Sequence, residues 1–154
     1  MIIQAETPAQ IEEARRLFRE YEAWLDVDLC FQSFEEELKN LPGKYAAPTG
    51  GLFLASVNEK IAGCVALRKI DDETSEMKRL FVRAEFRGSG LGKDLIERLI
   101  EEAKVIGYRK IRLDTLPEKM PQAVNLYEFY GFRQIKPYYE NPHGETLFME
   151  LVLA

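Results

Sequence analysis

The sequence predicts one α/β domain over residues 1–154, built on an α+β mixed sheet with helices on both faces. Three observations carry this prediction. Short apolar runs between turn residues predict strands, and longer stretches with apolar residues at helical spacing predict helices. The middle of the chain reads strand, glycine-rich loop, helix and strand, an order that produces a crossover connection. The complete predicted order is β-α-α-β-β-β-α-β-α-β-β.

The first strand and the first helix have well-marked boundaries. Residues 2–5 form a short apolar strand. Thr7 can cap the helix that follows, Pro8 fits its first turn, and Gln10 completes a capping box. Apolar residues continue at helical spacing as far as Leu25, which predicts a helix with one buried face.

A second helix and three strands follow. Ser33 begins a second capping box, and the short helix after it ends near residues 41–43. Residues 44–51 contain Pro48 and two glycines, which predicts a loop. Short polar connections, typical of hairpins, separate three predicted strands at residues 52–57, 61–70 and about 75–82.

The second half of the chain alternates helices and strands. Leu91 begins a long apolar-periodic helix, and Gly107 is placed to cap its end. Pro121 begins another helix, which ends at Gly131. The remaining strands are predicted at residues 110–115, 132–135 and 146–153.

Composition excludes several classes of protein. Hydrophobic residues make up 46% and charged residues 31% of the chain, which is ordinary for a folded domain. No apolar run approaches about 18 residues, so no membrane span is expected, and residues 1–4 lack the features of a signal peptide. We therefore expect a cytoplasmic protein. The net charge of −5 argues against a nucleic-acid partner.

The cysteines do not indicate a metal or redox site. Cys30 and Cys64 are far apart and form no metal-binding or redox motif. Both are expected to be buried small hydrophobic residues. No cluster of histidine, cysteine and aspartate has ligand spacing, so no metal is predicted.

Charge is distributed unevenly along the chain. Between residues 78 and 93 five bases and one acid give a local charge of +4, from Lys78, Arg79, Arg83, Arg87 and Lys93 against Glu85. Between residues 20 and 37 there are seven acids and no base. The first run suits an anionic ligand and the second a cation, with an ordinary solvated surface as the alternative for each.

The glycine-rich loop between the strand at 80–82 and the helix at Leu91 predicts a phosphate site. Three glycines at alternate positions leave backbone N–H groups uncovered, and the helix start adds further donors and a partial positive charge. A dinucleotide fingerprint beginning at Gly90 fails because Leu95 stands at its third glycine position. A phosphate-binding Walker loop fails because Arg87 and Asp94 replace residues it requires.

The pattern that fits is Arg-x-x-Gly-x-Gly/Ala, present as residues 87–92. It follows Glu-Met-Lys-Arg-Leu-Phe-Val at residues 76–82, and Ala-Val-Asn-Leu-Tyr-Glu-Phe-Tyr-Gly-Phe comes downstream at residues 123–132. Together these motifs resemble the GNAT superfamily of acetyl-CoA-dependent N-acetyltransferases. The element order extends the resemblance to the whole chain and implies a GNAT-like fold with a splayed central strand pair.

The resemblance implies acetyl-CoA as co-substrate. The loop backbone would hold the CoA pyrophosphate, with Lys93 nearby, through Arg87, Gly88, Ser89, Gly90, Leu91 and Gly92. The strand before the loop would splay from its neighbour, so that the pantetheine arm pairs with the main chain of Leu80, Phe81 and Val82. Asn125 matches a position that commonly hydrogen-bonds the CoA arm.

The resemblance also implies catalytic residues. Tyr127 matches the usual general acid, and simple packing is the alternative; Tyr130 is expected in the core. Because a phenol has a higher pKa than a thiol, Tyr127 is expected to donate a hydrogen bond to the leaving thiolate. Glu76 matches a frequent base, with a surface ion pair or a water relay as alternatives. His143 is expected in a turn.

The acceptor is predicted from the acidic run at residues 20–37 and the aromatic loop at residues 137–141, because this fold usually places both regions over the acceptor. They suit a small cationic amine, which attacks the thioester directly in a ternary complex. A protein lysine or N-terminal acetyltransferase and a non-catalytic acyl-CoA-binding module are the alternatives. Related proteins are often dimers, so a homodimer is one assembly that the resemblance allows.

Overall fold

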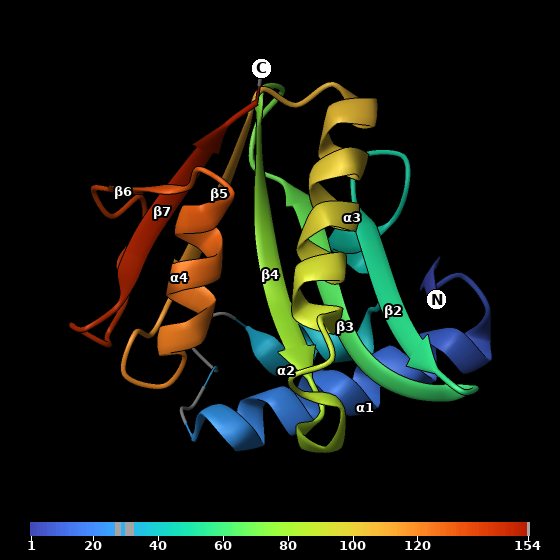
Figure 1. Ribbon diagram of the computed structural model, residues 1–154. Coiled ribbons are helices and arrows are strands. Elements are labelled where there is room, and N and C mark those ends of the chain that lie inside the picture. Colours follow the sequence, from blue (N-terminus) through green and yellow to red (C-terminus); the bar gives the residue numbers. More distant parts are fainter. Residues whose placement is uncertain (27–28, 30–32, 154) are drawn as a thin grey trace.

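The computed structural model describes residues 1–26, 29 and 33–153, and its element order is the predicted one (Figure 1). The prediction for Cys30 lies outside the described residues. The helices are α1 Pro8–Leu25, α2 Phe34–Lys39, α3 Leu91–Ile106 and α4 Pro121–Phe129. The strands are β1 Ile2–Gln4, β2 Gly51–Val57, β3 Lys60–Lys69, β4 Thr74–Val82, β5 Lys110–Thr115, β6 Arg133–Ile135 and β7 Leu147–Val152. Single 3-10 turns cover Gly43–Tyr45 and Ala84–Phe86.

The strands form one mixed sheet in the order β1-β2-β3-β4-β5-β7-β6. Every neighbouring pair is antiparallel except β4 and β5, which are parallel and joined through α3. Helices α1 and α2 cover one face with a core that includes Phe18, Phe34 and Leu54. Helices α3 and α4 cover the other face with a core that includes Leu95, Leu99 and Tyr127. The predicted fold class is confirmed.

Most predicted helix ends are present. Thr7 and Gln10 form the capping box at the start of α1, and Gly107 ends α3 in the left-handed conformation, with φ of 108°. The capping box predicted at Ser33 is wrong. Ser33 has φ of 56° and makes no side-chain capping bond, whereas a capping serine normally has extended backbone geometry that aims its hydroxyl at the first turn.

A β-bulge at Arg79 changes the direction of the side chains of β4. Arg79 has φ of 62°, and the register against β3 shifts between Cys64 and Ala66. Lys78 and Arg79, though consecutive, both face α2: Lys78 lines a cavity with α2 residues, and Arg79 binds Glu37. A bulge adds one residue to a strand and so inverts the alternation of the residues that follow it.

The pairing of β4 with β5 is short. It begins at Thr74 opposite Lys110 and ends at Glu76 opposite Arg112, although both strands continue beyond these residues. Figure 1 shows the two strands diverging beside α4. The splayed strand pair is therefore present, and the edge of β4 from Met77 onward has no strand beside it within the described residues.

Two arginines, Arg79 in β4 and Arg83 directly after it, attach the helices of one face to the sheet. Arg79 is 4% exposed and binds both carboxylate oxygens of Glu37 in α2, each at 2.9 Å. Arg83 binds both oxygens of Glu20 in α1 at 2.9 and 2.7 Å. Two-point guanidinium–carboxylate pairs of this kind define orientation as well as distance.

We expect Glu37→Ala to lower the free energy of unfolding by about 3 kcal/mol, because it leaves the buried Arg79 guanidinium without its carboxylate. Glu35→Ala is the matched control. It removes a carboxylate from the same first turn of α2, but one that pairs with Arg19 at the surface, so its cost should stay below about 1 kcal/mol. Urea unfolding measures both, and equal losses would contradict the assignment.

Candidate active site

The glycine loop before α3 is open and donor-rich. Gly88 and Gly90 have left-handed backbones, with φ of 83° and 84°. A Cβ atom at Gly88, Gly90 or Gly92 would meet nothing within 4 Å. Gly90 is also the N-cap of α3 and has no side chain to satisfy the first N–H groups. The loop and helix start therefore fit a phosphate group.

The two cations nearest this loop have different surroundings. The Arg87 Nε donates to the carbonyl oxygen of Val82 at 2.9 Å, and its guanidinium lies 4.7 Å from the ring centre of Trp24 in α1. Lys93 lies in the first turn of α3, with Nζ 5.7 Å from the exposed ring of Phe129. Arg87 thus holds the end of β4 against α1, and Lys93 stays beside the loop.

The predicted cluster of five cations around the loop needs correction. Arg79 and Arg83 pair with Glu37 and Glu20 on the face covered by α1 and α2, and Lys78 lines a cavity there. Two of the five cations are therefore neutralised by two of the seven acids of the acidic run. Sequence charge counts miss this because they do not say which face of a strand a side chain occupies.

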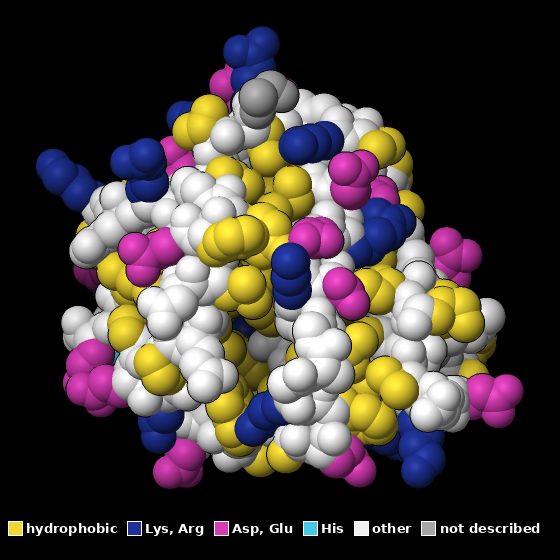
Figure 2. Space-filling view, viewed as in Figure 1, with side chains coloured by type: hydrophobic (Ala, Val, Ile, Leu, Met, Phe, Trp, Pro, Cys, Tyr) yellow, Lys and Arg dark blue, Asp and Glu magenta, His cyan; other side chains and the backbone are white. Residues whose placement is uncertain are grey.

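A small cavity of about 20 Å³ lies where β4 and β5 diverge. Its walls include Lys78, Leu80, Asp114 and Tyr127. Figure 2 shows hydrophobic side chains lining the hollow between α3 and α4 on the surface above this region. The predicted positions Leu80, Phe81 and Val82 follow the open edge of β4, so their main chain runs alongside the gap.

Helix geometry places Asn125 and Tyr127, the two predicted site residues of α4, on different sides of the helix. Tyr127 is 3% exposed, packs on Phe132 with ring centres 5.7 Å apart, and reaches the small cavity. Burial raises the pKa of Tyr127, so its hydroxyl keeps its proton and can donate it in a hydrogen bond. Asn125, two residues away, is exposed on another side of the helix. Tyr130 packs against the core, and its hydroxyl donates to Glu97 at 2.6 Å.

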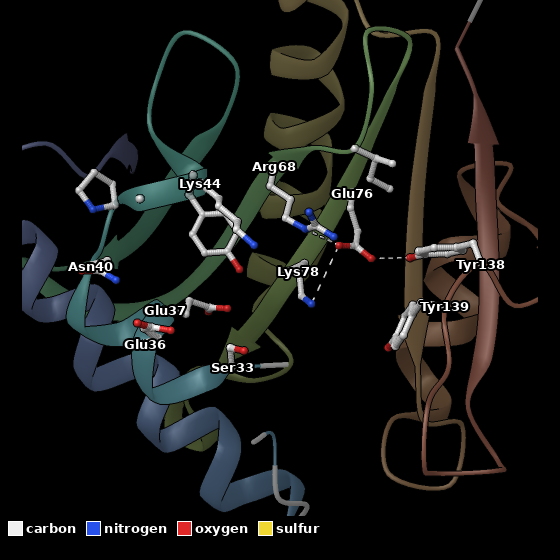
Figure 3. Close-up of a pocket in the computed structure, with 14 residues that line it drawn as sticks. Ser33, Glu36, Glu37, Asn40, Lys44, Arg68, Glu76, Lys78, Tyr138 and Tyr139 are labelled. Carbon is white, nitrogen blue, oxygen red and sulfur yellow. Dashed lines mark hydrogen bonds and ion pairs between the residues drawn. The ribbon is translucent and has the colours of Figure 1, made fainter. Parts of the chain in front are cut away.

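A larger cavity of about 560 Å³ opens beside the small one. Its walls come from α2, the turn at Gly43–Tyr45, strands β3 and β4, and the tyrosine pair Tyr138 and Tyr139 (Figure 3). The volume is in the range of small-molecule sites. Lys78 is the one residue common to the linings of both cavities, so it marks their junction.

Glu76 lies in the wall of the larger cavity and is 1% exposed. One oxygen accepts a hydrogen bond from the Arg68 Nε at 2.7 Å, and the other accepts one from the Tyr138 hydroxyl at 2.5 Å. The Lys78 Nζ lies 4.0 Å from the first oxygen. Figure 3 shows this group between α2 on one side and the two tyrosines on the other.

Asp114 is a site residue that the sequence reasoning missed. It lies near the end of β5, lines the small cavity with Tyr127, and accepts a hydrogen bond from the Tyr139 hydroxyl at 2.8 Å. Burial raises the pKa of Asp114, although Lys78 opposes the shift. The available signal was its place at the carboxyl end of a strand beside the crossover, where open sheets bind ligands.

Two residues of the aromatic loop, Tyr138 and Tyr139, line the larger cavity. The carbonyl of His143 accepts from the N–H of Thr146, the bond of a turn. Across the described residues, no three side chains of His, Cys, Asp or Glu are grouped to hold a metal ion. In the same residues, no helix combines the length and the apolar content that a bilayer crossing requires.

Comparison with known proteins places the chain in a family. Residues 11–132 match the model of the Acetyltransferase (GNAT) family. An uncharacterized N-acetyltransferase of Dictyostelium discoideum is 34% identical, and the match covers 94% of this chain and 95% of that protein. An uncharacterized N-acetyltransferase of Schizosaccharomyces pombe is 37% identical, with coverage of 96% and 91%.

Solved structures share the fold. An acetyltransferase from Streptococcus agalactiae superimposes with a TM-score of 0.78 at 29% identity, covering 99% of this chain and 98% of that one. An acetyltransferase of the GNAT family from Staphylococcus aureus gives a TM-score of 0.82 at 25% identity, covering 100% and 99%. The fold, the loop and the sequence relatives agree, and the chain is a member of the GNAT family of acetyltransferases.

Proposed function

We propose that this protein transfers the acetyl group of acetyl-CoA to the primary amine of a small molecule, by direct attack in a ternary complex. The observation that carries the proposal is the pair of adjoining cavities that share Lys78. One lies beside the open edge of β4, and the other is large enough for a separate acceptor. Two substrates can therefore meet at one junction, as direct transfer requires.

Acetyl-CoA fits the residues at the first cavity. The backbone of Arg87, Gly88, Ser89, Gly90, Leu91 and Gly92, with Lys93 beside it, would hold the pyrophosphate. The main chain of Leu80, Phe81 and Val82 would pair with the pantetheine arm, and Asn125 remains a predicted contact. When bound, acetyl-CoA supplies the reactive thioester.

Tyr127 is proposed to stabilise the departing thiolate. Its hydroxyl belongs to a buried ring that reaches the cavity beside β4, in surroundings that keep it protonated. A hydrogen bond to a developing anion is worth most where water is excluded. Full proton transfer is unnecessary for this role.

Two carboxylates are candidates for the base that accepts the proton of the amine. Glu76, the predicted base, lines the larger cavity, but both of its oxygens already accept hydrogen bonds. Asp114 lines the small cavity with Tyr127, and a carboxylate whose pKa is raised is better matched to proton transfer near neutral pH. We retain Glu76 as the base of the proposal and treat Asp114 as the competitor that experiment separates from it.

The size of the acceptor cavity favours a small molecule. The acidic run gives a cationic acceptor only limited support: Glu20, Glu35 and Glu37 pair with arginines, and Glu36 and Glu37 are the acids of the run that line the larger cavity within the described residues. The cationic character of the acceptor therefore comes from the amine itself, which is protonated in water and must lose a proton before attack. A protein acetyltransferase and a non-catalytic acyl-CoA-binding module are the two alternative functions, and measurement of thiol release distinguishes them.

The direct test is thiol release from acetyl-CoA against a panel of small amines, lysine peptides and peptide N-termini. We expect release with small amines to exceed release with any peptide by at least about tenfold, because the cavity encloses a compact acceptor. Higher activity on peptides would favour a protein acetyltransferase. Acetyl-CoA binding with no release would favour an acyl-CoA-binding module.

A matched pair of glycine variants controls this assay. Gly90 and Gly107 both have left-handed backbones in open space, at opposite ends of α3. An alanine at either position costs about 1 kcal/mol of backbone strain. Only Gly90→Ala should also weaken acetyl-CoA binding, by about tenfold in Kd, measured by calorimetry. An equal loss of affinity in Gly107→Ala would contradict the role of the loop.

Tyr127→Phe should lower kcat by about 100-fold and leave the Kd of acetyl-CoA unchanged, since it removes only the hydroxyl from a packed ring. Steady-state kinetics and calorimetry measure the two quantities. Tyr130→Phe is the control, because it removes a hydroxyl that bonds to Glu97 at the surface of the same region. A Tyr127→Phe enzyme with near-native turnover would end the assignment.

The pH dependence of Glu76→Gln and Asp114→Asn identifies the base. A carboxylate base works only when ionised, so wild-type activity falls as pH falls through its pKa. The rate ratio of wild type to the base variant should therefore be about 100-fold above that pKa and approach one below it. If Asp114 is the base, activity falls at a pH above the usual range of carboxylate pKa values, because the pKa of Asp114 is raised. The charged and titratable groups that act on Asp114 are Lys78, Arg79, Glu76 and Tyr139. If the ratio of the wild-type rate to the rate of one variant does not change with pH, the residue replaced in that variant is a positioning residue and not the base.

A further inference from the structure

The walls of the larger cavity carry both signs of charge in fixed positions. Its cations are Lys44, Arg68 and Lys78, and its carboxylates are Glu36, Glu37 and Glu76. Two of these carboxylates are bound by guanidinium groups, Glu37 by Arg79 and Glu76 by Arg68. Close to Arg68 and Lys78, the positive charges of these two side chains would attract an anionic group of a ligand.

Lys78 holds the most informative position among these cations. Its side chain is 12% exposed and lines both cavities, so a group that contacts its Nζ sits at the junction where acetyl transfer would occur. Burial lowers the pKa of the Lys78 ammonium. An anion from a substrate would oppose that shift and stabilise the charged form.

We propose that the acceptor amine carries a carboxylate close to its nitrogen, as a free amino acid does, and that Lys78 and Arg68 bind this carboxylate. The inference rests on the proposed acetyl transfer and names the class of acceptor. With its carboxylate at the junction, an α-amino acid has its amine only two bonds away. The amine can then enter the small cavity with Tyr127 and Asp114, while the side chain extends into the larger one.

This arrangement excludes most protein acceptors. A lysine side chain within a peptide has no carboxylate near its amine, and the carboxyl carbon of an N-terminal residue belongs to a neutral peptide bond. Neither presents a carboxylate to Lys78 and Arg68 when its amine is at the junction. A decarboxylated amine has the same defect and adds a like charge to the junction when it is protonated.

The test compares three forms of each acceptor: the free amino acid, its carboxamide and the decarboxylated amine, for apolar, acidic and basic side chains. We expect kcat/KM for the free acid to exceed both analogues by at least about tenfold in the wild-type enzyme, the scale of one charge-assisted contact. The comparison is stringent because a carboxylate raises the pKa of the adjacent amine, so intrinsic reactivity at pH 7 favours the amide.

Lys78→Met then tests the residue. It removes the charge and keeps an apolar side chain of similar length, so the preference for the acid over the decarboxylated amine should fall by about tenfold, mainly through KM. Lys104→Met, on the exposed last turn of α3, should leave the preference unchanged. Thermal unfolding of both variants separates loss of recognition from loss of fold.

Each outcome decides between the two proposals. Transfer to the decarboxylated amine or the amide that equals or exceeds transfer to the acid overturns the acceptor class and leaves acetyl transfer intact. If no acceptor releases thiol, the proposed function fails. Calorimetric binding of amino acid against amide to the CoA-loaded protein then decides the site alone: tighter binding of the acid that Lys78→Met abolishes supports it, and equal binding overturns it.

Discussion

The bulge at Arg79 determines how the central strand serves both faces of the sheet. Before it, Glu76 and Lys78 face the cavity beneath α2; after it, Leu80 and Val82 face the core beneath α3. Strict alternation would have placed all four residues on one face. One left-handed residue thus directs the polar half of β4 to the acceptor cavity and the apolar half to the core behind the glycine loop.

The same residue links the site to the stability of the fold. Arg79 binds Glu37 of α2, and Arg83 binds Glu20 of α1, so both helices of one face are attached to the strand that borders the acetyl-CoA region. Four of the charges from which the sequence predicts ligand-binding surfaces therefore pair with each other inside the fold. The charged residues that line the larger cavity are Lys44, Arg68, Lys78, Glu36, Glu37 and Glu76, and those that line the small one are Lys78, Arg79 and Asp114.

The divergence of β4 and β5 brings these groups together. Parallel pairing ends at Glu76 opposite Arg112, and the gap beyond it is bordered by Tyr127 from α4 and by Tyr138 and Tyr139 from the last loop. Each of these two tyrosines donates to a carboxylate of a different strand, Tyr138 to Glu76 and Tyr139 to Asp114. The loop therefore bridges the divergence and encloses the junction at which we place the acceptor.

The sequence by itself determined the element order, the ends of α1 and α3, the glycine loop and the family, because caps, glycines and apolar periodicity act over a few residues. It also placed Tyr127 and Glu76 on the elements where they are found. Only the tertiary structure decided that Arg79 and Arg83 leave the loop region and that Asp114 joins the site. Those facts depend on the bulge and on contacts between residues up to 63 positions apart in the chain, and no local pattern carries that information.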